Sequence, residues 1–391
     1  MSLTRSGYIS RIIDKKITDY LQLFGAVLVE GPKWCGKTWT SLNHAESVSY
    51  IMDPTGNYSN RALAHLNPAL ILVGDTPRLI DEWQEVPAIW DAVRFDIDQN
   101  PAFGKYLLTG STIPPRDSFI HSGTGRIASI RMRPMSLAES ADSTCRISLQ
   151  AVFEGERFDP HLCPMDIVRL IDLAARGGWP ETLKLPLEKA GSIAIEYINS
   201  IIRNDLFHND HSRRDQRKLR RLLRSLARNN ATTAGVNTLV QDTGGPSLDE
   251  QNQADLMLSR NTVSEYLKSL MDVFVIEEIP VWNPAIRSKT IMRQASKRVF
   301  TDPSLAIAAL GTNRTRLLND LQTFGFMFEN LCIRDLAIYA EAMGGSIFHY
   351  RDNSDLEVDV IIEMADGRWG AFEIKLGEER TDAAAQTLLR M

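Results

Sequence analysis

GPKWCGKT, residues 31–38, is the stretch that decides the fold of this chain. Its spacing fits G-x-x-x-x-G-K-[ST], the pattern of a phosphate-binding loop. Glycines let backbone N–H groups turn toward a phosphate, and the N-terminus of a following helix adds its positive dipole end. The segment therefore predicts a nucleotide site, with Lys37 on the β- and γ-phosphates and the Thr38 hydroxyl on Mg2+.

The residues on either side of this loop fit the same interpretation. Residues 26–30, AVLVE, predict a buried strand that runs into the loop, and residues 38–42 predict the start of a helix. A chance glycine-rich turn is the alternative, and it explains neither flank. We expect nucleotide contacts from Gly31, Pro32, Lys33, Trp34, Cys35, Gly36, Lys37, Thr38 and Trp39.

Composition sets the limits around this site. The chain has 391 residues, which predicts two or three domains, and its 43% hydrophobic and 24% charged residues are ordinary for a globular protein. A net charge of -5 means that nucleic-acid binding needs a local basic patch. The four cysteines form no C-x-x-C pair, which argues against structural zinc and disulfides. No segment resembles a membrane span or signal peptide, so we expect a cytoplasmic protein without membrane contact.

An acidic motif follows the loop by about 40 residues. Residues 77–82, PRLIDE, predict an apolar strand that ends in two carboxylates. In this arrangement Asp81 holds Mg2+ through water, and Glu82 polarises the attacking water. The alternative is an acidic pair that only caps the next helix.

A polar strand end and a single arginine complete the first set of candidates. Residues 106–108 predict a strand, and either Thr109 or Ser111 after it is placed to contact the γ-phosphate or the lytic water; we take Ser111 as the catalytic candidate. Arg126 is a candidate for stabilising the transferred charge, in cis or across a subunit interface. A surface salt bridge explains a lone arginine equally well.

Alternating strands and helices predict an α/β fold with a parallel sheet. Three segments, DEWQ at 81–84, LTGS at 108–111 and PMSLAE at 134–139, resemble the prokaryotic AAA-type ATPases that carry a restriction-endonuclease-like C-terminal domain. The resemblance covers nearly the whole chain. It implies an AAA-like P-loop core, ATP and Mg2+ as cofactors, and a homo-oligomer. Trp34 departs from the family's commoner loop, where that position is often smaller.

The middle of the chain is basic and helical. Residues 213–228, RRDQRKLRRLLRSLAR, predict a helix with its leucines on one face and basic residues on the rest. A helix at 236–241, another at 259–270 and a strand at 274–281 follow, which is the order of a winged helix. Its third helix offers groups for DNA phosphates and base edges at Arg260, Asn261, Ser264 and Lys268. A solvated basic face and a packing module are the alternatives.

The C-terminal stretch holds a second constellation. A helix at 324–339, strands at 346–351 and 357–363, and a strand at 369–375 place D and E-x-K in the order of the PD-(D/E)xK nuclease core, which the segment resembles. Glu373 and Lys375 lie two apart on the expected strand and share a face, so Glu373 and Asp359 are expected to hold one metal ion, with Glu329 as a further ligand. Lys375 would orient the lytic water. The alternative is an inherited scaffold with charges on an exposed strand.

These expectations give three parts: a P-loop AAA-like ATPase core at 1–145, a helical lid and winged-helix-like region at 146–285, and a restriction-endonuclease-like α/β domain at 286–391. The leading hypothesis is an ATP-hydrolysing switch that acts on double-stranded DNA. The alternative is a non-cleaving signalling or DNA-binding regulatory ATPase whose C-terminal domain only recognises a partner.

Overall fold

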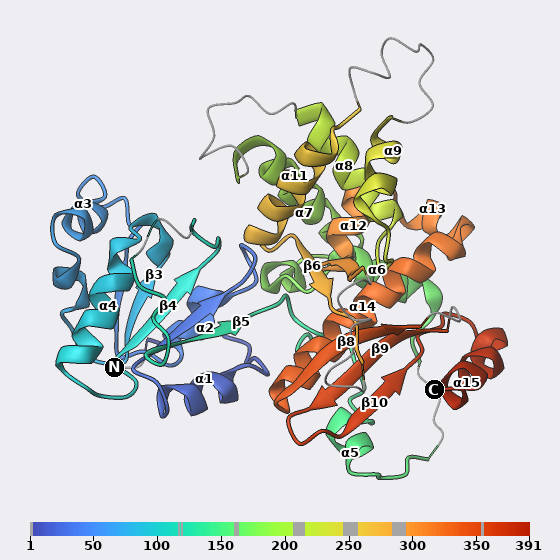
Figure 1. Ribbon diagram of the computed structural model, residues 1–391, viewed down its shortest axis with the longest axis horizontal. Coiled ribbons are helices and arrows are strands. Elements are labelled where there is room, and N and C mark those ends of the chain that lie inside the picture. The colour runs from blue at the N-terminus through green and yellow to red at the C-terminus, as the bar shows by residue number, and fades with distance from the viewer. Residues whose placement is uncertain are drawn as a thin grey trace. The chain divides into compact units, whose positions relative to one another are not determined.

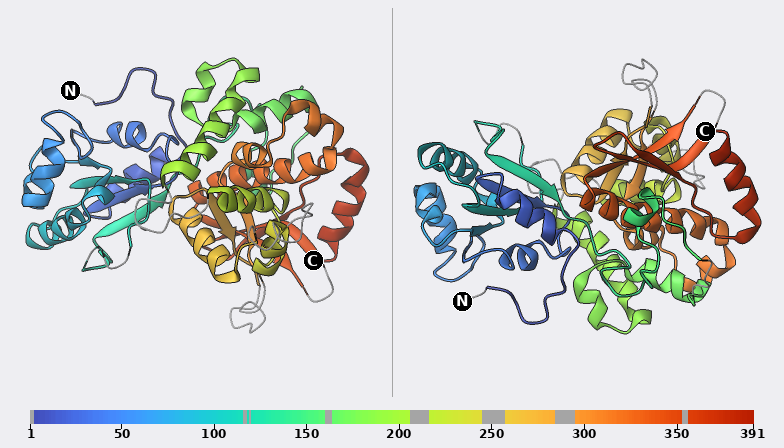
Figure 2. Two further views of the ribbon diagram at one scale, coloured as in Figure 1. Left: turned by 90° about the horizontal axis from the view of Figure 1, so that it is seen from above. Right: turned by 90° about the horizontal axis from the view of Figure 1, so that it is seen from below.

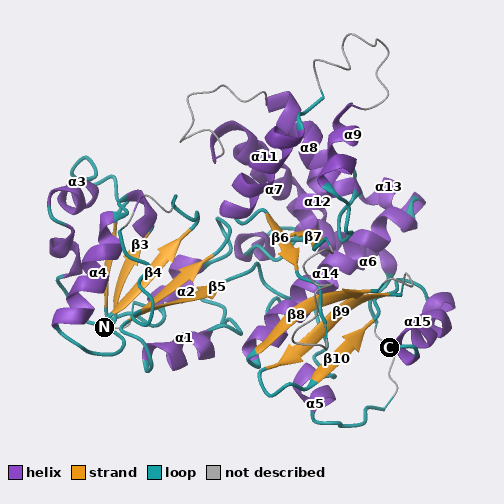
Figure 3. Cartoon of the chain, viewed as in Figure 1, coloured by secondary structure: helices purple, strands orange, loops and turns teal. Residues whose placement is uncertain are grey.

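The computed structural model describes residues 3–115, 118, 120–159, 164–205, 216–244, 257–283, 295–352 and 356–391. The chain forms two compact units, Met1–Pro134 with Asp272–Phe274, and Met135–Met271 with Val275–Met391. Figures 1 and 2 follow its course, and Figure 3 separates helices from strands. Within the described ranges, no helix is both long and apolar enough to span a bilayer. The three-part division stays a prediction, and its boundary at 285/286 lies outside the described residues.

The first unit contains a five-stranded sheet in the order β2-β3-β4-β1-β5, with every neighbouring pair parallel. The parallel α/β core expected from the alternation is therefore confirmed. β4 lies between β1 and β3, so the carboxyl ends of these three strands lie side by side. The strands are β1 (Ala26–Glu30), β2 (Ser47–Tyr50), β3 (Arg78–Asp81), β4 (Tyr106–Gly110) and β5 (Ile127–Arg131).

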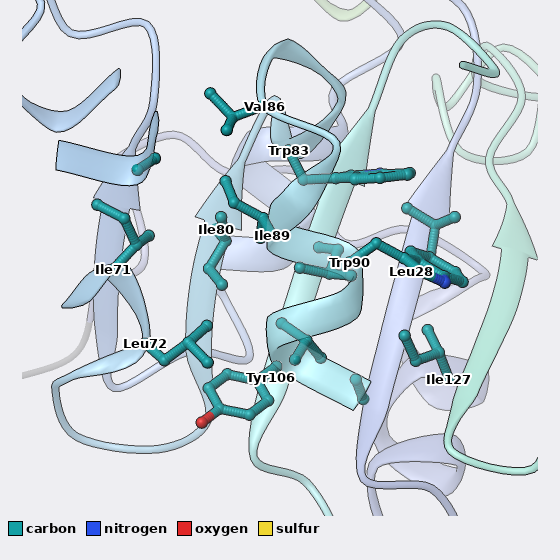
Figure 4. Close-up of a cluster of buried hydrophobic side chains, with 14 of the residues drawn as sticks. Leu28, Ile71, Leu72, Ile80, Trp83, Val86, Ile89, Trp90, Tyr106 and Ile127 are labelled. Atoms are coloured by element: carbon teal, nitrogen blue, oxygen red, sulfur yellow. The ribbon is translucent and has the colours of Figure 1, made fainter. Parts of the chain in front are cut away.

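Helices cover this sheet, and one apolar face is filled from the segment after β3. Trp83, Ile89 and Trp90 pack on Leu28 and neighbouring sheet residues, and the two indole rings lie 4.9 Å apart between centroids (Figure 4). Each such buried side chain contributes roughly 1.5–3 kcal/mol. The helical elements are α1 (Asp14–Leu21), α2 (Lys37–Leu42), α3 (Ser59–Leu66), η1 (Pro68–Leu72), η2 (Trp83–Glu85) and α4 (Ala88–Gln99).

The second unit begins with a helical layer around α12 (Pro303–Leu310). This helix is apolar on most sides. It contacts α6 (Ile167–Arg176), α7 (Leu187–Ser200), α8 (Gln216–Arg228) and α14 (Leu321–Ala342). Burial on all sides explains its composition. The other helices of this layer are α6, α7 and α13 (Arg314–Asn319), and η4 (Pro180–Lys184) and η5 (Ile201–Asp205) contact α7. The short helix α5 (Leu149–Phe153) packs instead on the C-terminal sheet, through Leu149 and Phe153.

The described part of the middle of the chain contains three helices and a strand pair near the expected positions, and the winged helix itself stays a prediction. α8 (Gln216–Arg228), α9 (Val236–Gly244) and α11 (Arg260–Asp272) precede the antiparallel pair β6 (Ile276–Ile279) and β7 (Lys297–Phe300). An isolated bridge between Thr232 and Arg298 adds a short third segment beside β7. Residues 213–215 of the expected basic helix lie outside the described residues.

The C-terminal part is a three-stranded antiparallel sheet, β10-β9-β8, with α14 (Leu321–Ala342) packed on β8 and β9. The elements β8 (Gly345–Arg351), β9 (Glu357–Met364), β10 (Trp369–Phe372), η7 (Glu378–Arg380) and α15 (Thr381–Leu389) follow in chain order. The expected strand at 369–375 is too long, because β10 ends at Phe372. Beyond it, the Ile374 N–H donates to the Asp359 carboxylate at 2.9 Å instead of continuing the ladder.

A buried ion network joins the layers of the second unit. The Arg334 guanidinium donates to Asp302 and Asp335, both at 2.7 Å, and Asp302 also accepts from the Gly178 N–H at 2.9 Å. A Cβ at Gly178 would lie 2.1 Å from the Met135 carbonyl oxygen, so only glycine fits there. The Gly177–Gly178 turn is therefore an internal junction of this unit.

Candidate nucleotide site and C-terminal carboxylate cluster

The phosphate-binding loop curls around its own lysine. Gly31 has φ 157°, and a Cβ there would lie 2.1 Å from the Met132 carbonyl oxygen, while Gly36 adopts the left-handed φ of 103°. Both positions therefore require glycine. The Lys37 ammonium is 5% exposed and donates to the Pro32 carbonyl at 2.8 Å. This geometry is that of a loop whose lysine lies inside the curve of the backbone.

The hydroxyl and carboxylate expected to hold Mg2+ lie in direct contact. Thr38 Oγ1 donates to Asp81 Oδ1 at 2.7 Å, and Thr109 Oγ1 donates to the same oxygen at 2.7 Å. Burial raises the pKa of Asp81 above its ordinary value, although both hydroxyls favour the charged form. Hydroxyl and carboxylate oxygens are the hard donors that Mg2+ prefers, so the residues present fit this ion.

The second carboxylate of the pair is fixed by its neighbours. Glu82 has a left-handed φ of 59°, and its N–H donates to Thr109 Oγ1 at 3.1 Å. Its Oε2 accepts from the Ser111 hydroxyl at 2.9 Å and from the Gln84 amide. The structure thus brings Glu82 and Ser111 together and adds Gln84, which is not among the site residues predicted from the motifs. Its position two residues after the acidic pair, in the turn of η2, is the signal that was available.

The remaining loop residues divide into buried and exposed groups. Cys35 is fully buried with its Sγ 3.6 Å from the Met132 carbonyl oxygen, which is a packing position. Trp34 is 59% exposed with a left-handed φ of 69°, and Trp39 is 37% exposed. Lys33 is also exposed. The two indoles lie within and directly after the loop, and both are exposed to solvent.

Arg126 lies at the wrong edge of the sheet for a role in its own chain's site. It precedes β5, and its carbonyl accepts from the Ala26 N–H at the start of β1, whereas the loop follows the other end of β1. Five strand residues separate the two edges, about 16 Å. The Arg126 side chain forms a 2.8 Å ion pair with Asp98 and is 49% exposed. A contribution in cis is therefore wrong, and only a contribution to another copy stays a prediction.

In the C-terminal part, the expected cluster does converge. Asp359 Oδ2 accepts from Lys375 Nζ at 2.9 Å, and Lys375 also pairs with Glu373 at 2.5 Å. The Glu373 side chain is 5% exposed. Asp359, Glu373 and Lys375 thus meet as predicted, although Glu373 and Lys375 follow the strand rather than lie on it.

An additional lysine, Lys297 of β7, lies between these carboxylates. Its Nζ is 2.7 Å from Glu329 Oε1 and 3.6 Å from Asp359 Oδ1, and the side chain is 1% exposed. Burial acts to lower the pKa of Lys297, but Glu329 and Asp359 raise it above its ordinary value, so it carries a charge at neutral pH. Burial raises the pKa of Glu329 to about 7. The residues next to Lys297 in the sequence give no sign that this lysine is buried.

Across the residues that the structure describes, no group of three or more His, Cys, Asp or Glu side chains is placed to hold a metal ion. The expected ligands Glu329, Asp359 and Glu373 are joined through lysines instead.

Two helices of the second unit present basic groups to solvent. On α8, Leu219, Leu222, Leu223 and Leu226 are buried, which confirms the predicted apolar face. Arg217, Arg220 and Arg224 are exposed on the same helix. On α11 the exposed residues are Arg260, Asn261, Ser264, Glu265 and Lys268.

Comparison with known families covers three segments of the chain. Residues 24–141 match the AAA domain family. Residues 168–316 match a domain of unknown function, DUF8612, and residues 324–391 match another, DUF4143. A search of the curated proteins found no match.

Solved structures similar to this chain include two named proteins. The Walker-type ATPase PABY2304 of Pyrococcus abyssi is 14% identical with a TM-score of 0.46, over 79% of this chain and 97% of that chain. A RuvB variant of Thermotoga maritima is 15% identical with a TM-score of 0.30, over 72% of this chain and 94% of that chain. At these scores the likeness carries no further argument. The AAA domain match and the loop geometry agree, and we conclude that the protein is an ATPase whose residues 24–141 form an AAA-type P-loop domain.

Proposed function

We propose that the first unit hydrolyses ATP at the carboxyl edge of its sheet, and that its nucleotide state controls binding of double-stranded DNA by the second unit. The observation that carries the ATPase part is the pair of 2.7 Å contacts from Thr38 and Thr109 to Asp81 Oδ1. Lys37 binds the β- and γ-phosphates, and Thr38 and Asp81 hold Mg2+. When bound, Mg2+ neutralises charge on the phosphate oxygens.

Glu82 is the proposed base for the attacking water. Ser111 and Gln84 both donate to Oε2, so Oε1 is the oxygen that accepts the proton of the water. The left-handed backbone of Glu82 and the bond from its N–H to Thr109 fix where this carboxylate points. Ser111 thus positions the base.

Substitution of the loop lysine tests this assignment. Lys37→Ala should lose ATP binding and hydrolysis, because the buried ammonium inside the loop is removed. Lys15→Ala is the control, since it removes an exposed lysine of α1 in the same unit and outside the loop, and it should retain hydrolysis. Nucleotide affinity and phosphate release are the two readouts. Hydrolysis by Lys37→Ala at the rate of the parent chain contradicts the proposal.

The DNA part rests on the winged-helix order of α8, α9, α11, β6 and β7 and on the exposed basic groups of α8 and α11. In a winged helix the third helix reads base edges. Arg260, Asn261 and Lys268 are exposed on α11 and supply groups that bond bases and phosphates. Glu265 is also exposed on α11, and its negative charge repels phosphates. Binding by this helix should therefore depend on base contacts and not on phosphate attraction alone.

Duplex affinity as a function of salt tests the DNA part. Replacing Arg217, Arg220 and Arg224 together with alanine should weaken binding, and the salt slope should fall by about 0.9 for each phosphate that is no longer neutralised. Binding should differ between ATP-analogue and ADP states, and Lys37→Ala should abolish that difference. Equal affinity in both states with intact hydrolysis would leave the ATPase assignment standing and remove the switch.

A nuclease is the second candidate, favoured by the convergence of Asp359, Glu373 and Lys375. The lysine contacts of these carboxylates favour a non-cleaving recognition domain instead. Plasmid nicking with Mg2+ or Mn2+, with and without ATP, separates the two. We expect none, and metal-dependent nicking that Lys375→Ala abolishes would establish the nuclease.

A further inference from the structure

In the C-terminal part, the carboxylates Glu329, Asp359 and Glu373 are each paired with the ammonium group of Lys297 or Lys375. Lys297 Nζ contacts Glu329 at 2.7 Å, the backbone oxygen of Asp359 at 3.4 Å and Asp359 Oδ1 at 3.6 Å. The more exposed Glu357 lies 3.8 Å from the same nitrogen. Asp359 Oδ2 is taken by Lys375 Nζ and the Ile374 N–H, both at 2.9 Å. Each oxygen of Asp359 therefore faces a positive group.

The positions of these groups decide what the cluster accommodates. A Mg2+ ion needs several oxygens at about 2.0–2.1 Å around one centre. Here Lys297, with 1% of its side chain exposed, lies between Glu329 on α14 and Asp359 on β9, two of the three side chains expected to share such an ion. A divalent ion beside this buried ammonium meets strong repulsion, because two like charges at short range in a low dielectric are unfavourable.

The neighbouring histidine adds no competing charge. Burial and the nearby Lys297 ammonium lower the pKa of His349 to about 4, so the ring is neutral at neutral pH. The positive charge that holds Glu329 and Asp359 together comes from Lys297, and Lys375 holds Asp359 and Glu373. The residues of this cluster thus do not fit a divalent metal.

We infer that Lys297 is a built-in cation that takes the position of a divalent metal ion between Glu329 and Asp359, while Lys375 bridges Asp359 to Glu373. The C-terminal fold then assembles these three carboxylates without any metal ion. The inference concerns these side chains alone, and it holds whether or not the second unit binds DNA.

Removing the ammonium tests this inference, since it should open a cation site. Lys297→Met keeps the length of the side chain and removes its charge. All chains carry Asp81→Asn, so that the first unit contributes no Mn2+ site, and nucleotide is omitted. Free Mn2+ is followed by electron paramagnetic resonance during titration of the full-length protein. The matched control is Lys184→Met, which breaks an exposed lysine pair with Glu181 in the same unit.

The parent and Lys184→Met should bind no Mn2+ at this cluster. Lys297→Met should gain one site, at least about tenfold tighter than any binding by the parent, or about 1.4 kcal/mol. Adding Asp359→Asn should remove the new site. The inference is overturned if the parent binds one Mn2+ that Asp359→Asn removes, or if folded Lys297→Met gains none.

Loss of folding in Lys297→Met is also informative. If circular dichroism shows that Mn2+ restores its structure, the metal has replaced the ammonium, as inferred. If Mn2+ does not restore it, the parent and its Asp359→Asn variant decide. Equal Mn2+ titrations of these two chains support the inference, and a site that disappears with Asp359 overturns it.

Discussion

At the scale of single residues, Thr109 connects the two carboxylates of the nucleotide site. Its hydroxyl donates to Asp81 and accepts from the Glu82 N–H, and the side chain is fully buried. One hydroxyl therefore sets the relative position of the proposed Mg2+ ligand and the proposed base. The residue lies on β4, so its contacts exist only because β4 lies between β1 and β3.

Thr109→Val should reduce ATP hydrolysis by about 10- to 100-fold, because it removes both hydrogen bonds with little change of shape. Removing the hydrogen-bond partner of buried groups should also cost roughly 1–3 kcal/mol of stability. Thr109→Ser keeps the hydroxyl and should restore most of the rate. Steady-state hydrolysis with measured nucleotide affinity checks this. Equal rates for the valine and serine variants would show that the hydroxyl has no positioning role.

Asp14 makes a second residue-scale prediction, concerning stability and pH. Burial acts to raise its pKa, but hydrogen bonds from His44, the Arg11 N–H and Tyr8 hold the pKa below its ordinary 3.8. A lowered folded pKa means that the ionised form stabilises the fold above pH 3.8 and loses this effect as the pH falls through the folded value.

Asp14→Asn should therefore destabilise the first unit by roughly 1–2 kcal/mol at neutral pH. The difference from the parent should shrink as the pH falls below 3.8. Urea unfolding across this range measures it. A difference that stays constant down to the lowest pH at which the parent remains folded contradicts the assigned pKa direction.

At the scale of elements, the two faces of α8 have different roles: the buried leucine face stabilises the fold, and the exposed basic face is proposed to bind DNA. Leu222 is fully buried on its apolar face, and Arg224 is exposed on its basic face. The helix also keeps Ser225 bonded to Asp242 of α9 at 2.9 Å. Changes on the two faces should therefore have different effects.

Leu222→Ala should cost about 2–5 kcal/mol, through lost transfer energy and the cavity that remains. Arg224→Ala on the same helix should change stability by less than about 0.5 kcal/mol and weaken duplex binding. Thermal unfolding and a salt titration of DNA binding check the pair. Destabilisation by Arg224→Ala as large as that by Leu222→Ala would show that the basic face is packed.

At the scale of the whole molecule, two compact units imply that unfolding need not be a single transition. Mg2+–ATP should stabilise the first unit by about 2.7 kcal/mol when nucleotide is at 100 times its dissociation constant. Hydrogen exchange should show added protection at the phosphate loop and at the ends of β3 and β4, and Lys37→Ala should abolish it. Protection that appears equally in Lys37→Ala would place nucleotide elsewhere.

A role of Arg126 in ATP hydrolysis would require assembly of the whole molecule with a second copy of the chain. Its ion pair with Asp98 lies at the edge of the sheet opposite the loop. We expect Arg126→Ala to hydrolyse ATP within about twofold of the parent. A large loss that is restored by mixing with Lys37→Ala chains would instead establish a homo-oligomer with a shared site.

Much of the fold could be predicted from local pattern. The strand at 26–30, the helix at 236–241 and the apolar face of α8 follow from periodicity and are present. The expected strand at 369–375 was too long, because a carboxylate from a neighbouring strand takes the N–H that a ladder would use. Such a competition between backbone and side chain across strands leaves no local signal.

The sequence by itself determined the phosphate loop, the acidic pair and the D…E-x-K order, because the residue types and spacings within each motif set their chemistry. Tertiary structure alone decided that β4 lies between β1 and β3, which brings Thr109 and Ser111 to the acidic pair. It also placed Arg126 at the far edge and Lys297 among the carboxylates. Strand order and the burial of one lysine depend on contacts between distant segments, and local spacing does not encode them.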